Sequence, residues 1–200
     1  MSVDPAKLQI VHYPSPVLRQ KAKPVDTITQ EVRAVATRML ELMFEARGIG
    51  LAAPQVGLPW RMFVVHVPAT DEDDDPDEPP RSPDHVPPTA TATPQIYINP
   101  KLTGFSRDLV AQSEGCLSIP GITGEVRRPS SVTITALDLQ GESITQQATG
   151  LLARCWQHEF DHIEGVLCID KFLPPDKRRA AKHLQAMEEA AGHLGTAARG

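Results

Sequence analysis

Hydrophobic residues recur with helical spacing in two segments of the chain, 29–47 and 150–164. In the first segment an apolar residue returns every three or four positions, which predicts a helix with one buried face. Thr27 and Gln30 predict a capping box at its start, and Gly48 stands where a helix end favours a left-handed residue. The second segment is apolar around most of its circumference and therefore predicts a central, buried helix.

Strand-like runs lie between the two helical segments. The predicted strands, rich in β-branched and aromatic residues, are 61–67, 95–99, 110–113, 131–138 and 142–148. A turn with a glycine joins the last two as a hairpin. Because the strands cluster between the helices and do not alternate with them, we expect an α+β fold with largely antiparallel sheets packed around the central helix.

A third helix is predicted near the C-terminus. Asp176 follows two prolines and is a good N-cap, and the chain from there towards Gly192 is rich in helix-forming residues. Its apolar stripe is weak. We therefore expect a peripheral helical extension over 176–200, attached to a main domain over 1–175.

The segment 69–94 interrupts the series of strands. It contains eight acidic residues, one arginine and seven prolines, and almost no apolar side chain that could enter a core. It is either an acidic interaction loop or an extended, solvated insertion between two strands, and we expect the insertion, because long surface insertions cost little closure entropy. Of the formal net charge of −5, this segment supplies 1 − 8 = −7, so the rest of the chain carries −5 + 7 = +2.

The composition excludes several classes of protein. A chain of 200 residues with 40% hydrophobic content suffices for one folded domain. An acidic chain is a poor candidate for binding nucleic acid or an anionic membrane. We find no apolar run of about 18 residues and no signal peptide. The three cysteines indicate a reducing compartment and no disulfide framework, so we expect a cytoplasmic protein.

The most specific motif is QHEFDH at 157–162. His158 and His162 are four residues apart on a helix, so both imidazoles reach one ion from the same face. Glu159 is rotated by about 100° from His158, where it can take a proton from metal-bound water without ligating the metal. Burial of these polar groups without a ligand would be unfavourable, so the motif predicts a metal site.

A catalytic metal site needs a third protein ligand. Cys155 is seven residues before His162, which corresponds to about 10.5 Å along a helix axis. This is too far for both residues to bind one ion, so we expect Cys155 in the pocket wall. Cys116 stands out, since a thiolate suits a metal held by imidazoles and Gly115 allows close backbone approach. The other candidates, for which core or solvated roles suffice, are Cys168, His12, His66, His85 and several carboxylates.

A loop of small residues, GIGLAAPQVG at 48–57, follows the first helix. It is a weak candidate for a phosphate loop, because it follows a helix and lacks a lysine. The glycines beside Ile49 can let the backbone pair with a substrate chain as an added strand. Gln55 is either an amide donor to an oxyanion or a surface residue of a packing loop.

Together GIGLAAPQVG, EGCLSIP at 114–120 and QHEFDHIEG at 157–165 resemble the signature motifs of the peptide deformylase family, over about 8–173. The resemblance implies a metal-dependent hydrolase that removes the N-formyl group from the formyl-methionine of new polypeptides and releases formate. It implies Fe²⁺ as the native ion, with Zn²⁺, Ni²⁺ or Co²⁺ able to substitute, and N-formyl-methionyl peptides as substrates. We expect the chain to act as a monomer. Whether the C-terminal helix contacts the ribosome exit region or only covers the core stays open.

The resemblance also implies roles for single residues. The metal ligands are Cys116, His158 and His162. Glu159 is the acid–base residue, and the Gln55 side chain and the Leu117 backbone N–H are the oxyanion donors. The substrate-binding residues are Ile49, Gly50, Glu114, Gly115, Leu151 and Cys155. Arg154 departs from the pattern, because an apolar residue is expected at this place near the methionine pocket.

Two other classes share part of the pattern. A metalloprotease also carries H-E-x-x-H, but it would take a His or Glu as third ligand, and the segment around Cys116 argues against it. A non-catalytic, metal-stabilised binding domain requires a closed site with four protein ligands, and the three motifs offer no fourth.

Overall fold

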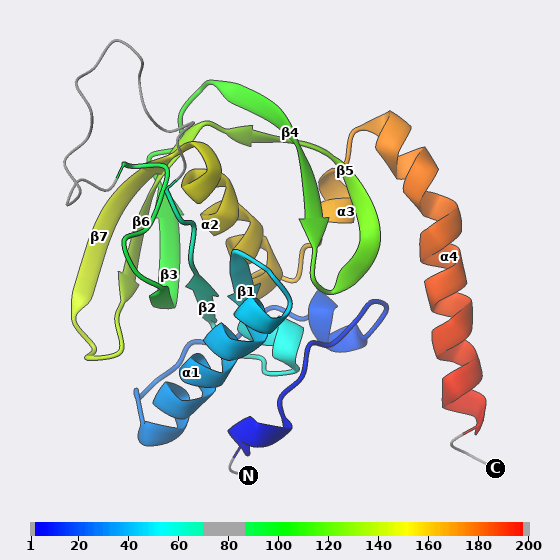
Figure 1. The fold of residues 1–200 in the computed structure, drawn as a ribbon, viewed down its shortest axis with the longest axis horizontal. Helices are drawn as coiled ribbons and strands as arrows, with labels where there is room; N and C mark the ends of the chain where they lie inside the picture. Colours follow the sequence, from blue (N-terminus) through cyan, green and yellow to red (C-terminus); the bar gives the residue numbers. More distant parts are fainter. Residues whose placement is uncertain (1–2, 70–86, 198–200) are drawn as a thin grey trace.

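The computed structural model describes the backbone of residues 3–69 and 87–197 and the side chains up to residue 191. The strands are β1 Gly50–Ala52, β2 Met62–Val65, β3 Gln95–Thr103, β4 Leu109–Cys116, β5 Ile119–Pro129, β6 Ser131–Leu137 and β7 Ser143–Thr149. The helices are α1 Gln30–Glu45, α2 Gly150–Ile163, α3 Cys168–Lys171 and α4 Pro174–Ala197, with short 3₁₀ turns at Pro5–Lys7, Pro16–Arg19 and Ala53–Val56. A five-stranded antiparallel sheet, β1-β2-β3-β6-β7, and the two-stranded sheet β4-β5 confirm the predicted α+β class (Figure 1).

The helices α1 and α2 cover opposite faces of the five-stranded sheet. Successive side chains of a strand point to opposite faces. Along β2, Phe63 and Val65 therefore enter the core shared with α2, whereas Met62 and Val64 enter the core shared with α1. Trp156 of α2 is 1% exposed. The helix lies between the two sheets, as expected for a central, buried helix (Figure 1).

Both ends of α1 differ from the prediction. Thr29, not Thr27, caps the helix, and its hydroxyl accepts a hydrogen bond from a backbone N–H of the first turn at 3.3 Å. At the other end Arg47, not Gly48, takes the left-handed conformation, with φ 56°. Gly48 meets a different requirement, because a Cβ at this position would lie 2.7 Å from the Cδ1 atom of Leu117.

The acidic segment is described only in its last part. Residues 70–86, which include His85, lie outside the described residues. Within 87–94, Pro88 and residues 92–94 are exposed, in line with a solvated insertion, whereas Pro87, Ala90 and Thr91 are buried against the fold. Thr91 is buried and its hydroxyl accepts a hydrogen bond from the Val67 N–H at 3.0 Å, and the Thr89 carbonyl accepts one from the first turn of α2 at 3.1 Å.

The C-terminal helix α4 packs its first turns against β5. Ala180 is buried in a core cluster that includes Val126. The Asp176 carboxylate accepts a hydrogen bond from the backbone N–H of Glu125 at 2.7 Å. The helix begins at Pro174, so Asp176 is not its N-cap, and the backbone N–H groups of Asp176 and Lys177 both donate to the Leu173 carbonyl at 3.0 Å. Among the described residues, no helix combines the length and apolar character needed to cross a lipid bilayer.

Candidate metal centre and active site

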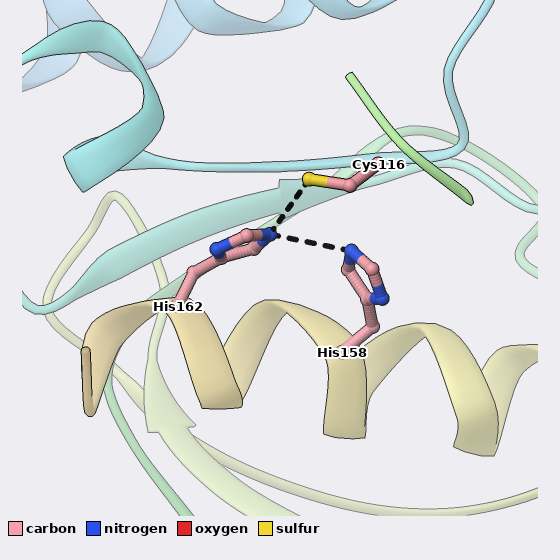
Figure 2. A group of neighbouring side chains, drawn as sticks. All are labelled: Cys116, His158 and His162. Carbon is pink, nitrogen blue, oxygen red and sulfur yellow. Dashed lines mark hydrogen bonds between the residues drawn. The ribbon is translucent and has the colours of Figure 1, made fainter. Parts of the chain in front are cut away.

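Three side chains with metal-binding atoms converge between α2 and β4 (Figure 2). His158 and His162 project from successive turns of α2 towards Cys116, the last residue of β4. The ligand atoms lie within 4.8 Å of one another. His162 Nε2 is 3.3 Å from Cys116 Sγ and 3.2 Å from His158 Nε2.

This donor set fits a divalent metal ion. Ligand atoms held at 2.1–2.3 Å from a tetrahedral ion are themselves separated by about 3.4–3.6 Å, close to the distances between these side chains. Glu159 Oε2, on the residue next to His158, is buried and has no hydrogen-bond partner among the described residues. Imidazoles with a thiolate suit iron, zinc, nickel or cobalt. The residues therefore agree with the class of metal that the resemblance implies.

The other cysteines lie outside this ligand group. The Cys155 thiol is directed to the Ile49 carbonyl, at 3.5 Å, in agreement with a place in the pocket wall. Cys168 is 2% exposed and belongs to the core. A hydrogen bond with the neighbouring Cys168 thiol, together with burial, raises the pKa of Cys116.

Glu159 is buried beside the ligand group and is 3% exposed. Its carboxylate lies against the backbone of β1, where a Cβ at Gly50 would be 2.4 Å from Oε1. Burial raises the pKa of Glu159 to about 7, against the opposing effect of the positive charges of His158 and Arg128. A carboxyl group with such a pKa can accept and return a proton near neutral pH.

Gln55 is 1% exposed, so it is not a surface residue of a packing loop. Its Oε1 accepts a hydrogen bond from the Ala52 N–H at 2.8 Å, which fixes the orientation of the amide. Its Nε2 is consequently directed into the site, 3.5 Å from Cys116 Sγ and 3.3 Å from Ser118 Oγ. Leu117, whose N–H is the other predicted oxyanion donor, lines the same cavity.

The carboxylate of Glu114 is surrounded by positively charged and polar groups. Arg128 donates to it at 2.6 and 2.8 Å, Arg154 at 2.6 Å, and His158 Nδ1 is 3.0 Å away. Burial favours the neutral acid, but the hydrogen bonds from Arg128 and His158 hold the pKa of Glu114 well below its usual range. The contact with Nδ1 turns His158 Nε2 towards Cys116. Glu114 therefore lies behind the metal ligands, with its side chain engaged by them and by the arginines.

Arg128 and Ser118 belong to the site and were not predicted. Arg128 joins Glu114 to Asp161, to which it donates at 2.8 Å. Every second residue of β5 towards Arg128 is buried, so this arginine falls on the inner face. Glycines and prolines interrupt the apolar pattern of this segment, so no clear signal marks it in the sequence. His12, expected to be partly buried, is instead exposed, and it lines the cavity.

The ligand group opens into a cavity of about 620 Å³. The predicted substrate-binding residues all line it: Ile49, Gly50, Glu114, Gly115, Leu151 and Cys155. Arg154 lines it as well. Strand β1 ends the five-stranded sheet, and β4 pairs with β5 alone among the described strands. Each strand thus has one unpaired edge, and Gly50 and Gly115 bring both strands to the cavity.

The fold and this site define a metal-dependent hydrolase in which an H-E-x-x-H helix is joined by a cysteine from a neighbouring strand. Residues 7–178 match the family model described as polypeptide deformylase. The chain belongs to the polypeptide deformylase family, and its activity is the removal of N-formyl groups from nascent polypeptides.

Relatives and solved structures agree with this assignment. The chain is 48% identical to peptide deformylase 2 of Gloeobacter violaceus over 155 residues, 78% of this chain and 73% of that protein. It is 39% identical to the peptide deformylase of Novosphingobium aromaticivorans over 189 residues, 92% and 98% of the two chains. The crystal structure of the plant peptide deformylase PDF1B superposes with a TM-score of 0.81 at 34% identity, covering 97% of this chain and 95% of that one.

Proposed function

We propose that the cavity beside α2 is where the chain hydrolyses N-formyl-methionyl peptides, with Glu159 as the acid–base residue. The observation that supports this most is the convergence of Cys116, His158, Glu159 and Gln55 on one cavity, with His162 completing the ligand group behind it. Water is added across the formyl C–N bond, so that formate and a free amino terminus leave. The reaction needs one proton acceptor, one donor to the leaving nitrogen and stabilisation of the oxyanion.

Fe²⁺ is the ion we propose for the native site, with Zn²⁺, Ni²⁺ or Co²⁺ as substitutes. Cys116, His158 and His162 would hold it. When bound, such an ion lowers the pKa of water towards about 7 and polarises a carbonyl oxygen. The mixed thiolate and imidazole donors support an ion of this class.

Glu159 takes the proton of the attacking water and returns it to the departing amine nitrogen. Two features support this role: Oε2 has no partner among the described side chains and backbone groups, and burial raises the pKa of this carboxyl to about 7. Gln55 Nε2, held by the Ala52 bond, and the Leu117 N–H donate to the oxyanion as it forms. Donors fixed in advance stabilise such charge without the cost of reorganisation.

The peptide chain enters as an added strand between β1 and β4. Gly50 and Gly115 offer unpaired backbone groups there, and Ile49 extends the same edge. The methionine side chain then lies beside Leu151 and Cys155. The close approach of Gly50 to Glu159 leaves little room at the reacting carbon, which favours a formyl hydrogen over a second peptide chain.

We further propose that residues 1–175 form the catalytic domain and 176–200 an extension, and that the chain acts as a monomer in the cytoplasm. The family match, which ends at residue 178, supports this boundary. The first turns of α4 cover β5, and the exposed positions 181–183 and 185–186 of the helix offer a surface for contact with the ribosome exit region.

The test is formate release from formyl-methionyl-alanyl-serine after anaerobic loading with Fe²⁺ or Ni²⁺, with metal content measured on the same sample. We expect turnover that requires the metal. Absence of formate above a metal-free control at full loading would contradict the proposal, and cleavage of an internal peptide bond would favour a metalloprotease. Cys116→Ser should lower the metal content. Unchanged metal content in this variant would indicate that the third ligand is a histidine or glutamate, as in a metalloprotease.

A further inference from the structure

Arg154 is a charged residue at a place where the family resemblance predicts an apolar one. It lies on α2 one turn before His158 and is 7% exposed. It lines the cavity, but its hydrogen bonds direct the guanidinium to Glu114 and to the backbone of the two-stranded sheet. The proposed function assigns no part to this ion, so its role has to be sought in these contacts.

Two backbone carbonyls hold the guanidinium of Arg154 in place. Nη2 donates to the Val110 carbonyl of β4 at 2.7 Å, and Nη1 donates to the Val126 carbonyl of β5 at 3.0 Å. Nη1 also donates to Glu114 Oε1 at 2.6 Å. Because a guanidinium is planar and rigid, the two contacts with the sheet fix the direction from which it meets the carboxylate.

The carboxylate of Glu114 connects Arg154 to one of the proposed metal ligands. Its Oε1 accepts a hydrogen bond from Arg154, and its Oε2 lies 3.0 Å from His158 Nδ1. The partner of one ring nitrogen of a metal-binding histidine sets the direction of the other ring nitrogen. The orientation of Glu114 therefore determines where His158 Nε2 points, which is towards His162 Nε2 at 3.2 Å.

Arg128 keeps the charge of Glu114 paired even without Arg154. Its Nε and Nη2 donate to the two carboxylate oxygens at 2.6 and 2.8 Å. A buried carboxylate left without a cation would destabilise the fold strongly, but loss of Arg154 leaves the pair with Arg128 intact. What is lost is the second donor to Oε1, so the effect should fall on the orientation of the carboxylate more than on folding.

We propose that Arg154 is a positioning residue of the metal centre, which acts through Glu114 to hold His158 in the orientation that binds the ion. In this role it contacts neither the substrate nor the ion. A charged residue is accommodated beside the methionine pocket because Glu114 pairs its charge. This proposal deepens the proposed function and rests on it, since it concerns the same ligand group.

The experiment measures the Co²⁺ affinity of the protein and of Arg154→Met without substrate. Competition with a chelating dye gives Kd, and the visible absorption of bound Co²⁺ reports the geometry of its ligands. Loss of an outer hydrogen-bond partner weakens metal binding by about 10–100-fold, and we expect a Kd about tenfold higher, with a changed absorption spectrum. At full loading, kcat for formyl-methionyl-alanyl-serine should fall, while KM should change less than about twofold.

Two further variants separate positioning from packing. Arg154→Lys keeps the charge but lacks the planar fork, so its Kd should lie between those of the protein and Arg154→Met. Gln157 Nε2 donates to the Pro129 carbonyl of β5 at 3.0 Å and to the Ala153 carbonyl at 2.9 Å, not to Glu114. Gln157→Met thus removes another contact between α2 and β5, and it should lower Tm while leaving the Co²⁺ Kd within about twofold.

A double-mutant cycle tests the route through Glu114. In Glu114→Gln the ion pair with Arg154 is already lost. Residues that act through one another give changes that do not add, so Arg154→Met should raise Kd by less than about threefold in this background. The same substitution raises it by about tenfold in the protein itself.

The proposal is overturned if Arg154→Met and Arg154→Lys both bind Co²⁺ with the Kd and absorption of the protein, or if Gln157→Met weakens binding equally. A full tenfold effect of Arg154→Met in the Glu114→Gln background also overturns it, as does a rise in KM alone, which would make Arg154 a substrate contact. Failure of the proposed function looks different, because then no formate is released at full loading, whereas the Co²⁺ measurements are made without substrate.

Discussion

At the scale of single residues, the site depends on buried polar groups whose orientation is fixed by neighbours. The Ala52 N–H orients Gln55, and Gly50 leaves room for the carboxylate of Glu159. Glu114 contacts His158 Nδ1 at 3.0 Å. Because each of these groups positions another, small substitutions should change catalysis more than they change folding.

Glu159→Ala should retain metal and lose turnover. Removal of a positioned acid–base group lowers kcat by about 10²–10⁴-fold, while the ligands Cys116, His158 and His162 are unchanged. Formate release and metal content on one sample check this. Glu159→Gln is the matched control, since it fills the same space without exchanging protons and should lose activity equally. Full activity in either variant would assign proton transfer to another group.

Gly50→Ala should lower kcat without lowering metal content. The added Cβ would lie 2.4 Å from Glu159 Oε1 and 2.8 Å from the adjoining carbon atoms, so the carboxylate must move. A displacement of about 1 Å can cost on the order of 100-fold in rate. The comparison is Gly115→Ala on the facing strand, where the nearest atom, Thr123 Cγ2, would be 3.4 Å away and the effect should fall mainly on KM. Equal losses of kcat in the two variants would contradict the assigned contact.

The sequence allowed us to predict the proposed metal ligands, but not the buried ion pairs that hold them in position. The spacing of His158 and His162 restricts them to one helical face, and the structure places both beside Cys116. Arg128 and Glu114 are distant from these histidines in the chain. In a sequence, the two charged residues of a buried ion pair cannot be distinguished from charged residues on the surface. Only the fold shows that Arg128 is on the inner face of β5.

At the scale of elements, the C-terminal end of α2 is tied to the N-terminal segment and to the start of β2. Glu164 follows the helix and pairs with Lys21 at 2.6 Å and with Arg61. The guanidinium of Arg61 also lies over the ring of Phe160, 5.1 Å from its centre. These contacts hold the helix end that follows His162 in place.

Glu164→Gln should lower the free energy of unfolding by about 1 kcal/mol at pH 7. Partial burial raises the pKa of Glu164, but the bonds from Lys21 and Arg61 outweigh this and lower it. A carboxyl with a lowered folded-state pKa stabilises the fold above its unfolded pKa of about 4.5, and this is lost as the pH falls through the folded value. Urea denaturation should therefore show a difference in the free energy of unfolding between the protein and Glu164→Gln at pH 7, and this difference should be smaller at pH 3.

The control for that measurement is Glu142→Gln. Glu142 is exposed in the turn between β6 and β7 and forms no ion pair with a described side chain. It should change the free energy of unfolding little at either pH. A Glu164→Gln effect of the same size at both pH values would contradict the ion-pair origin.

The prediction of elements succeeded where one periodicity dominated. The helices α1 and α2 and the hairpin β6–β7 have clear patterns. Strand β5 was missed because glycines, prolines and the buried Arg128 interrupt its alternation of apolar residues. Strand β1 was read as a loop, since its three residues become a strand only by pairing with β2. The helix α3 is a single turn and has no period to detect.

At the scale of the whole molecule, the three proposed metal ligands come from two parts of the fold. Cys116 ends β4, in the two-stranded sheet, whereas His158 and His162 belong to α2, which is packed on the five-stranded sheet. The order of strands and helices along the chain predicted the α+β class. It did not contain the information that the free edges of β1 and β4 face one cavity, because this depends on packing between the sheets.

Metal removal should lower Tm, because an ion held by both parts stabilises only the folded state. At a free ion concentration of 100 times Kd, the stabilisation is about 2.7 kcal/mol, which corresponds to a shift of about 5–10 °C for a chain of this size. Differential scanning calorimetry of chelator-treated and Ni²⁺-loaded protein measures it. Cys116→Ser should reduce the shift, and His183→Ala, which changes an exposed histidine of α4, should keep it. A full shift in the cysteine variant would contradict the ligand assignment.

The register of the main sheet has a practical consequence for protein engineering. Val65 at the end of β2 faces Gln95 at the start of β3, so the chain leaves and re-enters the sheet at neighbouring strand ends. These ends stay adjacent whatever the length of the connection, and each doubling of that length adds only about 0.6 kcal/mol of closure cost. A reporter peptide or an affinity tag inserted between residues 69 and 87, which leaves the contacts of Thr89 and Thr91 intact, can therefore be carried without changing the register of any strand.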